Sequence, residues 1–527
     1  MHEKGLGASL ACTYLPLALA CSSAAGSSAS ALAPAAAPAA IQVESGQVAG
    51  VASADPSITV FKGIPYAAPP VGELRWRPPR APLRWSGVRS ASTFSKSCTQ
   101  ELRRSLLPWT EEFMLGNDVS EDCLALNVWA PARAVGDAKA ALPVYVYLHG
   151  GAFTSGSGEV ALYDGEALAR RGILVVTVNY RLGVFGFYCH PELSAESSEH
   201  SCGNYGLLDQ LSALGWVQRN IAAFGGDPHN ITVGGQSAGA ASVHALAQSP
   251  LARGLFQRMI AQSGPWDRHL PWPTRAEAEA QGLDFASGAS LAQLRAQSAE
   301  ALLARQQNGG RFRPAVDGWV IPDQLAALAA RGELADLPLL TGITADERSS
   351  QADYGKLNRQ QLAELVQKEY GDLAAAVLAL YPAATDADAS AQHRQLARDM
   401  GLATLLDCRR TRAAHGQARD FGYFFERAIP WPEHPEYQAF HSADLPYAFD
   451  NLSKLNRPWE SADHQLADRM ASYWVNFITR GDPNGPGLPE WPSDREHILR
   501  LGVDPRAELT LPQAKAALLL QRFAALP

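Results

Sequence analysis

A serine flanked by glycines at fixed spacing marks the chemistry that this chain could carry. The pattern G-x-S-x-G covers residues 235–239, with Ser237 at its centre. An apolar run at residues 231–233 precedes it, and a run of Ala and Gly follows it. A tight strand-to-helix turn here would force unfavourable backbone angles on Ser237 and expose its hydroxyl at the positive end of a helix. The five-residue pattern also occurs by chance, but these flanks favour a nucleophilic serine.

A glycine pair after another apolar run could stabilise the charge that such a serine creates. Residues 144–148 lead into His149, Gly150, Gly151 and Ala152. These residues could form an ordinary glycine turn. They could also aim backbone N–H groups at the oxygen that becomes negative in a tetrahedral intermediate. Because a candidate nucleophile lies downstream, we favour an oxyanion hole.

A nucleophilic serine also needs a base and a carboxylate that orients the base. Two histidines, His434 and His441, lie in a loop after the apolar run at residues 421–425. Two acids, Asp346 and Glu347, follow the run at residues 337–340. Residue types and spacing alone leave both pairs open.

Short apolar runs, each followed by turn residues and a helical stretch, must position these side chains. The runs cover residues 144–148, 173–178, 231–233, 337–340 and 421–425. Near-continuous Val, Ile and Leu fits strands buried on both faces, and the alternation with helices predicts a largely parallel sheet. Reactive groups in such sheets lie just beyond the carboxyl ends of the strands, where the candidates above are found.

Much of the chain resembles the type-B carboxylesterases, which include cholinesterases and bacterial para-nitrobenzyl esterases. The matching stretches run in the family's order from about residue 41 to 495. They are FKGIPY at 61–66, LRW at 74–76, SEDCLALNVW at 120–129, NYR at 179–181, GNYGLLDQ at 203–210, FGGDP at 224–228, QSG at 262–264, DG at 317–318 and GDPN at 481–484. The resemblance implies one large α/β-hydrolase domain over residues 41–527. Its mixed, mostly parallel sheet would carry helices on both faces and large helical insertions around a gorge.

The resemblance also implies which residues form the site. Ser237 would be the nucleophile, Glu347 the acid and His441 the base. Asp444 stands where the family usually has a Glu behind the base. The oxyanion donors would be the backbone N–H groups of Gly151, Ala152 and Ala238.

Three residues depart from the family pattern. Gln236 replaces a Glu that is common before the nucleophile, and Ala152 replaces a third glycine. Phe113 stands where cholinesterases have a Trp that binds quaternary ammonium groups by cation–π contact. The missing carboxylate and the weaker aromatic platform argue against choline esters as substrates.

The implied reaction is two-step ester hydrolysis through an acyl-enzyme, on a small-molecule ester and with no metal or organic cofactor. The same machinery could cleave amides or thioesters. A rival of another class is a non-catalytic adhesion protein, since relatives without the serine serve that role. The presence of all three triad residues argues against this rival.

Composition excludes several other classes. The 527 residues are 46% hydrophobic and only 19% charged, with a formal net charge of −8. No run of Lys and Arg could follow a phosphate backbone, so nucleic acid is not an expected partner. No internal stretch reaches the roughly 18 apolar residues of a membrane span. The oligomeric state stays open.

The N-terminus predicts export. Lys4 is followed by an uncharged segment that ends at Ala20, typical of a signal sequence over residues 1–20. Cleavage after Ala20 would release a secreted or periplasmic protein, whereas lipidation of Cys21 would anchor it to a membrane, such as the outer membrane. Residues 21–40 are rich in Ala, Ser and Pro, which predicts a tether.

An exported chain can keep disulfides, and five cysteines follow the tether. The family resemblance implies a bond between Cys98 and Cys123, with Arg75 paired to Glu121 beside it. Cys189 and Cys202 flank a polar insertion between two family-like stretches, so they could form a second bond. They could also be two separate thiols, because Cys packs well as a small apolar residue. Cys408 would remain as the odd one.

Overall fold

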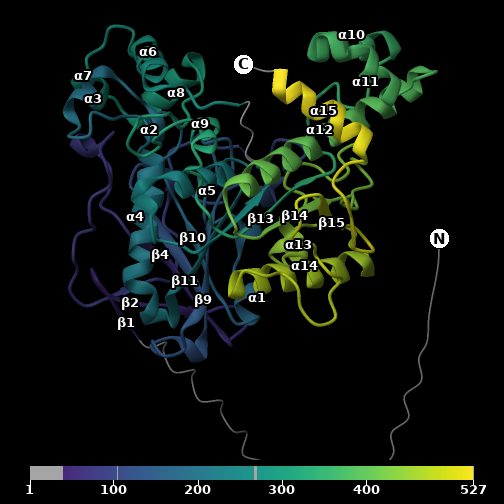
Figure 1. Cartoon of the computed structure of the whole chain (residues 1–527). Helices are drawn as coiled ribbons and strands as arrows, with labels where there is room; N and C mark the ends of the chain where they lie inside the picture. Colours follow the sequence, from purple (N-terminus) through teal and green to yellow (C-terminus); the bar gives the residue numbers. More distant parts are fainter. Residues whose placement is uncertain (1–39, 104, 266–269, 526–527) are drawn as a thin grey trace, which may run out of the picture. The chain divides into compact units, whose positions relative to one another are not determined.

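The structure is a computed structural model. Its described residues form an eleven-stranded mixed sheet (Figure 1). In spatial order its strands are β16 (Arg506–Leu509), β15 (His497–Leu501), β14 (Asp420–Phe425), β13 (Leu339–Thr344), β12 (Arg258–Gln262), β11 (Gly226–Gln236), β9 (Leu142–Leu148), β10 (Leu174–Val178), β8 (Ala125–Pro131), β4 (Ile58–Pro65) and β3 (Val51–Ala52). From β15 to β10 neighbouring strands run parallel, and the remaining pairs are antiparallel. The prediction of a mixed, mostly parallel sheet is confirmed.

Residues 40–103, 105–265 and 270–525 are described. Pro38–Pro527 form one compact unit. The predicted signal sequence, most of the predicted tether and Cys21 lie outside the described residues. Short strands outside the main sheet are β1 (Ile41–Val43), β2 (Gly46–Ala49), β5 (Val88–Ser90), β6 (Ser97–Cys98) and β7 (Val119–Ser120).

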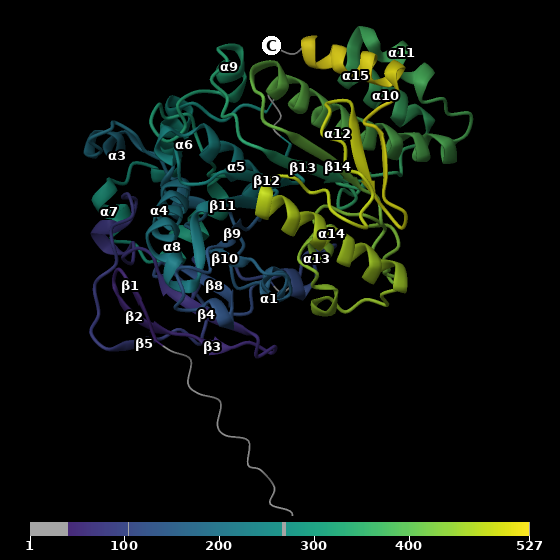
Figure 2. The same cartoon turned by 60° about the horizontal axis from the view of Figure 1, so that its bottom comes forward.

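Helices cover both faces of the sheet, because alternate residues of its strands are apolar on both sides (Figure 2). In β9, Val144 and Val146 join one buried cluster while Tyr145 and Tyr147 join the other. The first face carries α2 (Gly183–Phe187), α3 (Pro191–Glu196), α4 (Tyr205–Asn220) and α5 (Ala238–Gln248). The second carries α1 (Glu166–Arg170), α13 (Leu445–Ala448), α14 (Ser461–Arg480) and α15 (Gln513–Ala525).

Two large helical insertions interrupt the parallel strands. Between β12 and β13 lie α6 (Arg275–Ala286), α7 (Leu291–Arg295), α8 (Ala299–Gly309) and α9 (Leu325–Ala330). Between β13 and β14 lie α10 (Arg359–Tyr370), α11 (Ala374–Leu380) and α12 (Asp386–His415). Several begin with a capping box, in which the N-cap side chain accepts the N–H of the residue three positions on, and the N-cap N–H donates to the side chain of that residue. These N-caps are Thr274, Ser290, Asn358 and Thr385.

The sequence suggests that Gly234 and Gly342 lie in the turns that end two strands. In the structure both lie inside strands. The run predicted at 337–340 begins two residues later and continues to Thr344, through Gly342. A Cβ on Gly342 would lie 2.3 Å from the ring of Tyr423, so the glycine makes room for a neighbouring aromatic side chain. Gly234 makes room for Tyr145 in the same way, at 2.4 Å. Close packing, rather than turn formation, explains these glycines.

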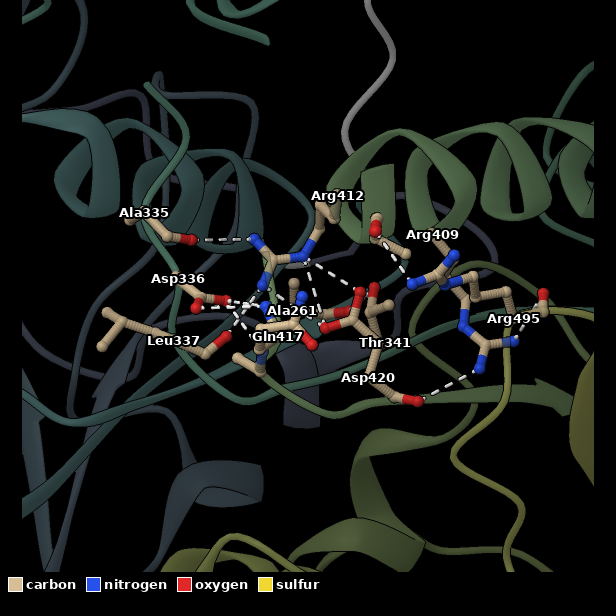
Figure 3. A network of polar contacts seen from close by, with 12 residues as sticks. Ala261, Ala335, Asp336, Leu337, Thr341, Arg409, Arg412, Gln417, Asp420 and Arg495 are labelled. Atoms are coloured by element: carbon tan, nitrogen blue, oxygen red, sulfur yellow. Dashed lines mark hydrogen bonds and ion pairs between the residues drawn. The ribbon is translucent and has the colours of Figure 1, made fainter. Parts of the chain in front are cut away.

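A buried arginine network fixes the starts of β13 and β14, and so the place of the loops that follow them (Figure 3). Arg412 of α12 pairs with Asp420 at 3.0 Å and donates to the carbonyl of Leu337 at 2.7 Å. Arg409, one turn earlier, donates to the carbonyls of Asp420 and His497 at 3.1 and 2.7 Å. Asp420 pairs with Arg412, whereas Arg409 is held by carbonyl oxygens, and its buried Nε has no hydrogen-bond partner among the described residues. The network links α12 to β14 and to the residues just before β13.

The structure contains both expected disulfides. The Cα atoms of Cys98 and Cys123 lie 5.0 Å apart, and those of Cys189 and Cys202 lie 4.9 Å apart. Both distances fall in the range that a disulfide spans. Cys408 is buried and takes part in neither bond.

Arg75 and Glu121 form the expected ion pair beside the first disulfide, through two bonds of 2.7 and 2.5 Å. Arg75 also donates to the carbonyl of Gln297 at 2.7 Å, which ties this region to the first helical insertion. Among the described helices none is long and apolar enough to cross a bilayer.

Loss of the first disulfide should lower stability measurably. Cys98→Ser with Cys123→Ser should reduce the free energy of unfolding by about 3 kcal/mol, because the bond closes a chain segment with a separation of 25 residues. Denaturant titration of both proteins measures the difference. Non-reducing peptide mapping of the unmodified protein should recover the two cysteines in one linked pair. Recovery of both as thiols would contradict the prediction.

Candidate active site

Ser237 occupies a strained turn between β11 and α5. Its backbone angles are φ 56° and ψ −120°, which L residues rarely adopt. Small neighbours allow this turn, since a Cβ on Gly239 would lie 2.0 Å from the carbonyl oxygen of Leu148. The N–H of Ser237 donates to Gln262 at 2.9 Å, which secures the turn to β12. The half-buried side chain is therefore held at the carboxyl edge of the sheet, as the G-x-S-x-G pattern predicts.

The loop after β9 brings backbone donors to the same edge. Gly150 packs against Ser237, because a Cβ added to it would lie 3.2 Å from the Cβ of that residue. Ala152 takes a left-handed φ of 55°. Among the described residues no acceptor takes the N–H groups of Gly151, Ala152 and Ala238. These three N–H groups are the oxyanion donors that the family resemblance predicts, and the structure places them on the loop after β9 and at the first residue of α5.

The buried side chain of His149 helps to hold this loop in place. Its imidazole is buried, stacks on Tyr180 with ring centroids 4.3 Å apart, and lies 2.8 Å from the carbonyl oxygen of Gly150. Burial lowers the pKa of His149 to about 4, so the ring is neutral at neutral pH. A carbonyl can only accept, so Nδ1 carries the proton and donates. His149 thus holds the Gly150 peptide in place.

A short backbone bridge brings the acid and base loops together. Asp346 pairs with Phe440 in a parallel bridge, and its N–H donates to the carbonyl of Ala439 at 2.9 Å. Glu347 directly follows Asp346, and His441 directly follows Phe440, so the bridge brings these two residues close together. His441 Nδ1 donates to Glu347 Oε2, while Glu347 Oε1 accepts the N–H of Thr344 at 2.8 Å.

The other member of each candidate pair has a different environment. Asp346 is 1% exposed and accepts bonds from Tyr354 and Arg398, both at 2.8 Å. His434 pairs with Glu436 at 3.2 Å on the surface of its loop. Neither contacts the Ser237 turn through any bond among the described residues. The geometry therefore separates the pairs that the sequence left open.

The electrostatics of the pair favour charge on both partners. Burial alone would raise the pKa of Glu347, but His441 outweighs it and the pKa lies below its ordinary value. Burial alone would lower the pKa of His441, but Glu347 outweighs it and the pKa lies above 6.5. An imidazole that gains a proton here would be stabilised by the carboxylate beside it.

Asp444 lies behind the base without touching it. It is fully buried and accepts bonds from Tyr423 at 2.6 Å and Gln262 at 3.0 Å. Burial raises the pKa of Asp444. The negative charge of Asp444 contributes to the raised pKa of His441.

Gln236 contacts the base directly, which its place in the sequence did not indicate. Its side-chain amide lies 3.0 Å from His441 Nε2, the nitrogen that faces away from Glu347. In the neutral imidazole Nδ1 donates to Glu347, so Nε2 accepts from the amide. Within the described residues no hydrogen bond joins the Ser237 hydroxyl to His441. Catalytic bonds of this kind often form only when a substrate is bound.

The structure also shows a contact that sequence reasoning missed. Trp109 Nε1 lies 3.1 Å from the carbonyl oxygen of His441. These residues are 332 positions apart and no local pattern joins them. Phe113, from the same loop, packs edge-on against Phe440 at 5.8 Å.

One cluster of metal-ligating side chains occurs among the described residues, made of Cys189, Cys202 and Glu279. The two sulfurs are joined in a disulfide and are not thiolate ligands. The cluster therefore does not present a metal site in this oxidised form.

Several proteins that are similar to this chain are named as esterases. The sequence profile of the Carboxylesterase family matches residues 37–517. Fumonisin B1 esterase of Sphingopyxis macrogoltabida is 37% identical over 470 residues, which cover 85% of this chain and 83% of that protein. Para-nitrobenzyl esterase of Bacillus subtilis is 36% identical over 477 residues, which cover 86% and 92%. Human cocaine esterase is 32% identical over 504 residues, which cover 88% and 87%.

A family match along nearly the whole chain, together with an α/β fold that sets a strained serine beside a histidine–glutamate pair, leads to one conclusion. This chain belongs to the carboxylesterase family and is a carboxylic ester hydrolase.

Proposed function

We propose that Ser237, His441 and Glu347 hydrolyse carboxylic esters through an acyl-enzyme. The observation that carries this proposal is the contact of His441 Nδ1 with Glu347, beside the strained turn of Ser237. In the first step Ser237 Oγ attacks the ester carbonyl while His441 Nε2 takes its proton. His441 then donates that proton to the departing alcohol. In the second step His441 takes a proton from water, whose oxygen attacks the acyl carbonyl. The acyl–Ser237 bond then breaks, His441 returns the proton to Ser237 Oγ, and the acid is released.

The N–H groups of Gly151, Ala152 and Ala238 are the proposed donors to the oxyanion in both steps. They come from the loop after β9 and from the first residue of α5, which directly follows Ser237. Backbone donors fixed before the reaction stabilise the developing charge without reorganisation. Gln236 must release His441 Nε2 before Ser237 can use it. We assign to Gln236 the role of holding the resting imidazole in place.

The proposed substrates are esters without a quaternary ammonium group. Gln236 supplies no negative charge beside His441, and Phe113 offers a weaker cation–π surface than Trp. The relatives are named for different esters, so they do not indicate one substrate. Amides and thioesters are the second class that the same groups could cleave, with esters favoured by their better leaving group.

A panel of purified substrates tests this assignment. It contains p-nitrophenyl esters of increasing acyl length, a choline ester, a matched amide and a matched thioester. We expect hydrolysis of the nitrophenyl esters and little turnover of the choline ester. A kcat/KM for the choline ester equal to that of the matched neutral ester would contradict the substrate proposal. A faster amide than ester would contradict the reaction class.

The pH dependence should reveal the raised pKa of His441. The imidazole must be neutral to accept the serine proton, so activity falls as pH drops through its pKa. Glu347 raises that pKa above 6.5. The acidic limb, the part of the plot of kcat/KM against pH where activity falls toward low pH, should therefore have its midpoint above pH 6.5. In Glu347→Gln the limb should move to lower pH and the maximum should fall. A limb below pH 6 in the unmodified enzyme would contradict the coupling.

We further propose export of the protein, with cleavage after Ala20 and a tether that follows. The uncharged segment ahead of Cys21 supports this proposal. Mass spectrometry of the N-terminal peptide from the native host tests it. A peptide that begins at Cys21 supports export, with an acyl group indicating a lipid anchor and a bare cysteine indicating release. A peptide that keeps Met1 would contradict export.

A further inference from the structure

The disulfide-closed loop between Cys98 and Cys123, residues 99–122, rests on both halves of the candidate active site. Near its start Gln100 is 2% exposed and exchanges two bonds with the backbone of Gly156, each 2.8 Å long. Gly156 lies at the end of the turn that begins at Gly151 and Ala152, two of the proposed oxyanion donors. A Cβ on Gly156 would lie 2.3 Å from Nδ1 of His149, so this turn fits closely against its support.

Further along the same loop, Trp109 reaches the turn that carries the base. Its Nε1–H is shared between the carbonyl oxygen of His441 at 3.1 Å and Ser442 Oγ at 3.2 Å. The indole also stands edge-on to the imidazole, with ring centroids 6.2 Å apart and planes at 82°. One side chain therefore contacts the base residue through both its backbone and its ring.

The turn that Trp109 contacts needs such support. Ser442 has a φ of +88°, a conformation that costs on the order of 1–3 kcal/mol for a residue other than glycine. Strained turns persist only where their surroundings hold them. Inside the turn, the N–H groups of Ala443 and Leu445 donate to the carbonyls of Phe440 and Ser442. Other segments tie it through the backbone bridge at Phe440 and through the bonds of the His441 ring to Glu347 and Gln236. The two bonds from Trp109 are the ones that reach the His441 carbonyl and the Ser442 hydroxyl.

We propose that Trp109 is a positioning residue for the base, which holds His441 in line with Ser237 from the disulfide-closed loop. This inference rests on the proposed function, because it requires His441 to be the base. The N–H of Trp109 fixes the backbone on the carboxyl side of His441, while Glu347 fixes the ring from Nδ1. The indole edge limits how far the imidazole can swing. An error of about 1 Å in such a group can cost 10²-fold in rate.

Two other roles for Trp109 predict different kinetics. A tryptophan that only packs the loop would affect stability and leave the kinetics of the folded enzyme unchanged. A tryptophan that only binds substrate would change KM and leave kcat unchanged. A positioning residue lowers kcat with little change in KM. It should also shift the acidic limb, because looser contact with Glu347 lets the pKa of His441 fall toward its ordinary value. The charged groups that act on His441 are Glu347 and Asp444, and neither bonds to Trp109.

The test compares Trp109→Phe with Trp459→Phe, using p-nitrophenyl acetate and the full chain. Trp459 is a matched control, since it is half-buried and its Nε1 also donates to two acceptors, the carbonyls of Leu452 and Leu455. We expect Trp109→Phe to lower kcat roughly 10-fold, keep KM within about twofold and move the acidic limb to lower pH. The rate of fluorophosphonate labelling of Ser237 should fall by the same factor. Trp459→Phe should leave all four quantities unchanged.

The inference is overturned if Trp109→Phe keeps kcat within twofold, if only KM changes, or if Trp459→Phe gives the same losses. If Trp109→Phe does not fold, 3-benzothienylalanine at position 109 decides, because it keeps the shape of the ring and removes only the N–H. Esterase activity of the unmodified chain and its loss in Ser237→Ala are measured alongside. Failure of these two would contradict the proposed function instead.

Discussion

Ser237→Ala should reduce ester hydrolysis by roughly 10⁶-fold while leaving a folded protein. The loss is large because the three catalytic groups act as a unit, so His441 and Glu347 cannot work without the nucleophile. The fold should survive because the Ser237 hydroxyl makes no hydrogen bond among the described residues. Alanine has the same Cβ as serine, so the strained φ of 56° becomes no more costly. The residual rate would come from the oxyanion donors and from binding alone.

Initial rates on p-nitrophenyl acetate and a thermal melt measure the two parts of this prediction. Ser249→Ala is the control, since Ser249 lies just after the same helix and its buried hydroxyl has no partner. It should keep full activity. Mass spectrometry after fluorophosphonate treatment should find the adduct on Ser237. An adduct on another serine, with activity retained in Ser237→Ala, would overturn the assignment.

The sheet could be predicted from the sequence because its strands are buried on both faces. Such strands need uninterrupted Val, Ile and Leu, and the run at 173–178 matches β10 to within one residue. The ends of strands were less predictable. Gly234 and Gly342 read as turns because a glycine in a sequence does not show whether it provides backbone freedom or room for a neighbouring ring.

The residues of the candidate site also differ in how well the sequence predicts them. Some belong to a local pattern, whereas others depend on contacts between distant segments. Ser237 sits in a local pattern, so its turn could be read from the residues on either side. The choice between Asp346 and Glu347 depends on which carboxylate reaches the ring of His441. Glu347 does, whereas the carboxylate of Asp346 accepts bonds from Tyr354, Arg398 and the N–H of Ala439. Only the family resemblance selected between them. The contact of Trp109 with His441 joins distant parts of the chain, and no periodicity or spacing signals it.

His441→Gln should reduce hydrolysis roughly as much as loss of the nucleophile, whereas His434→Gln should keep most of the activity. Glutamine at 441 could still accept a hydrogen bond, but it cannot carry a proton from Ser237 to the leaving alcohol. The rate should therefore fall by about 10⁶-fold. His434 is the matched control, because it lies in the same loop and its own carboxylate partner is Glu436. Its replacement should change stability by less than about 0.5 kcal/mol, as is usual for surface sites.

The two variants also separate the base from a merely electrostatic role. In His441→Gln the remaining activity should no longer show an acidic limb near the pKa of the imidazole, because the group that titrates is gone. In His434→Gln the limb should stay where it is in the unmodified enzyme. Both profiles come from kcat/KM measured between pH 5 and 9 on one neutral ester. Equal losses in the two variants, or an unchanged limb in His441→Gln, would show that the pair with Glu347 does not supply the base.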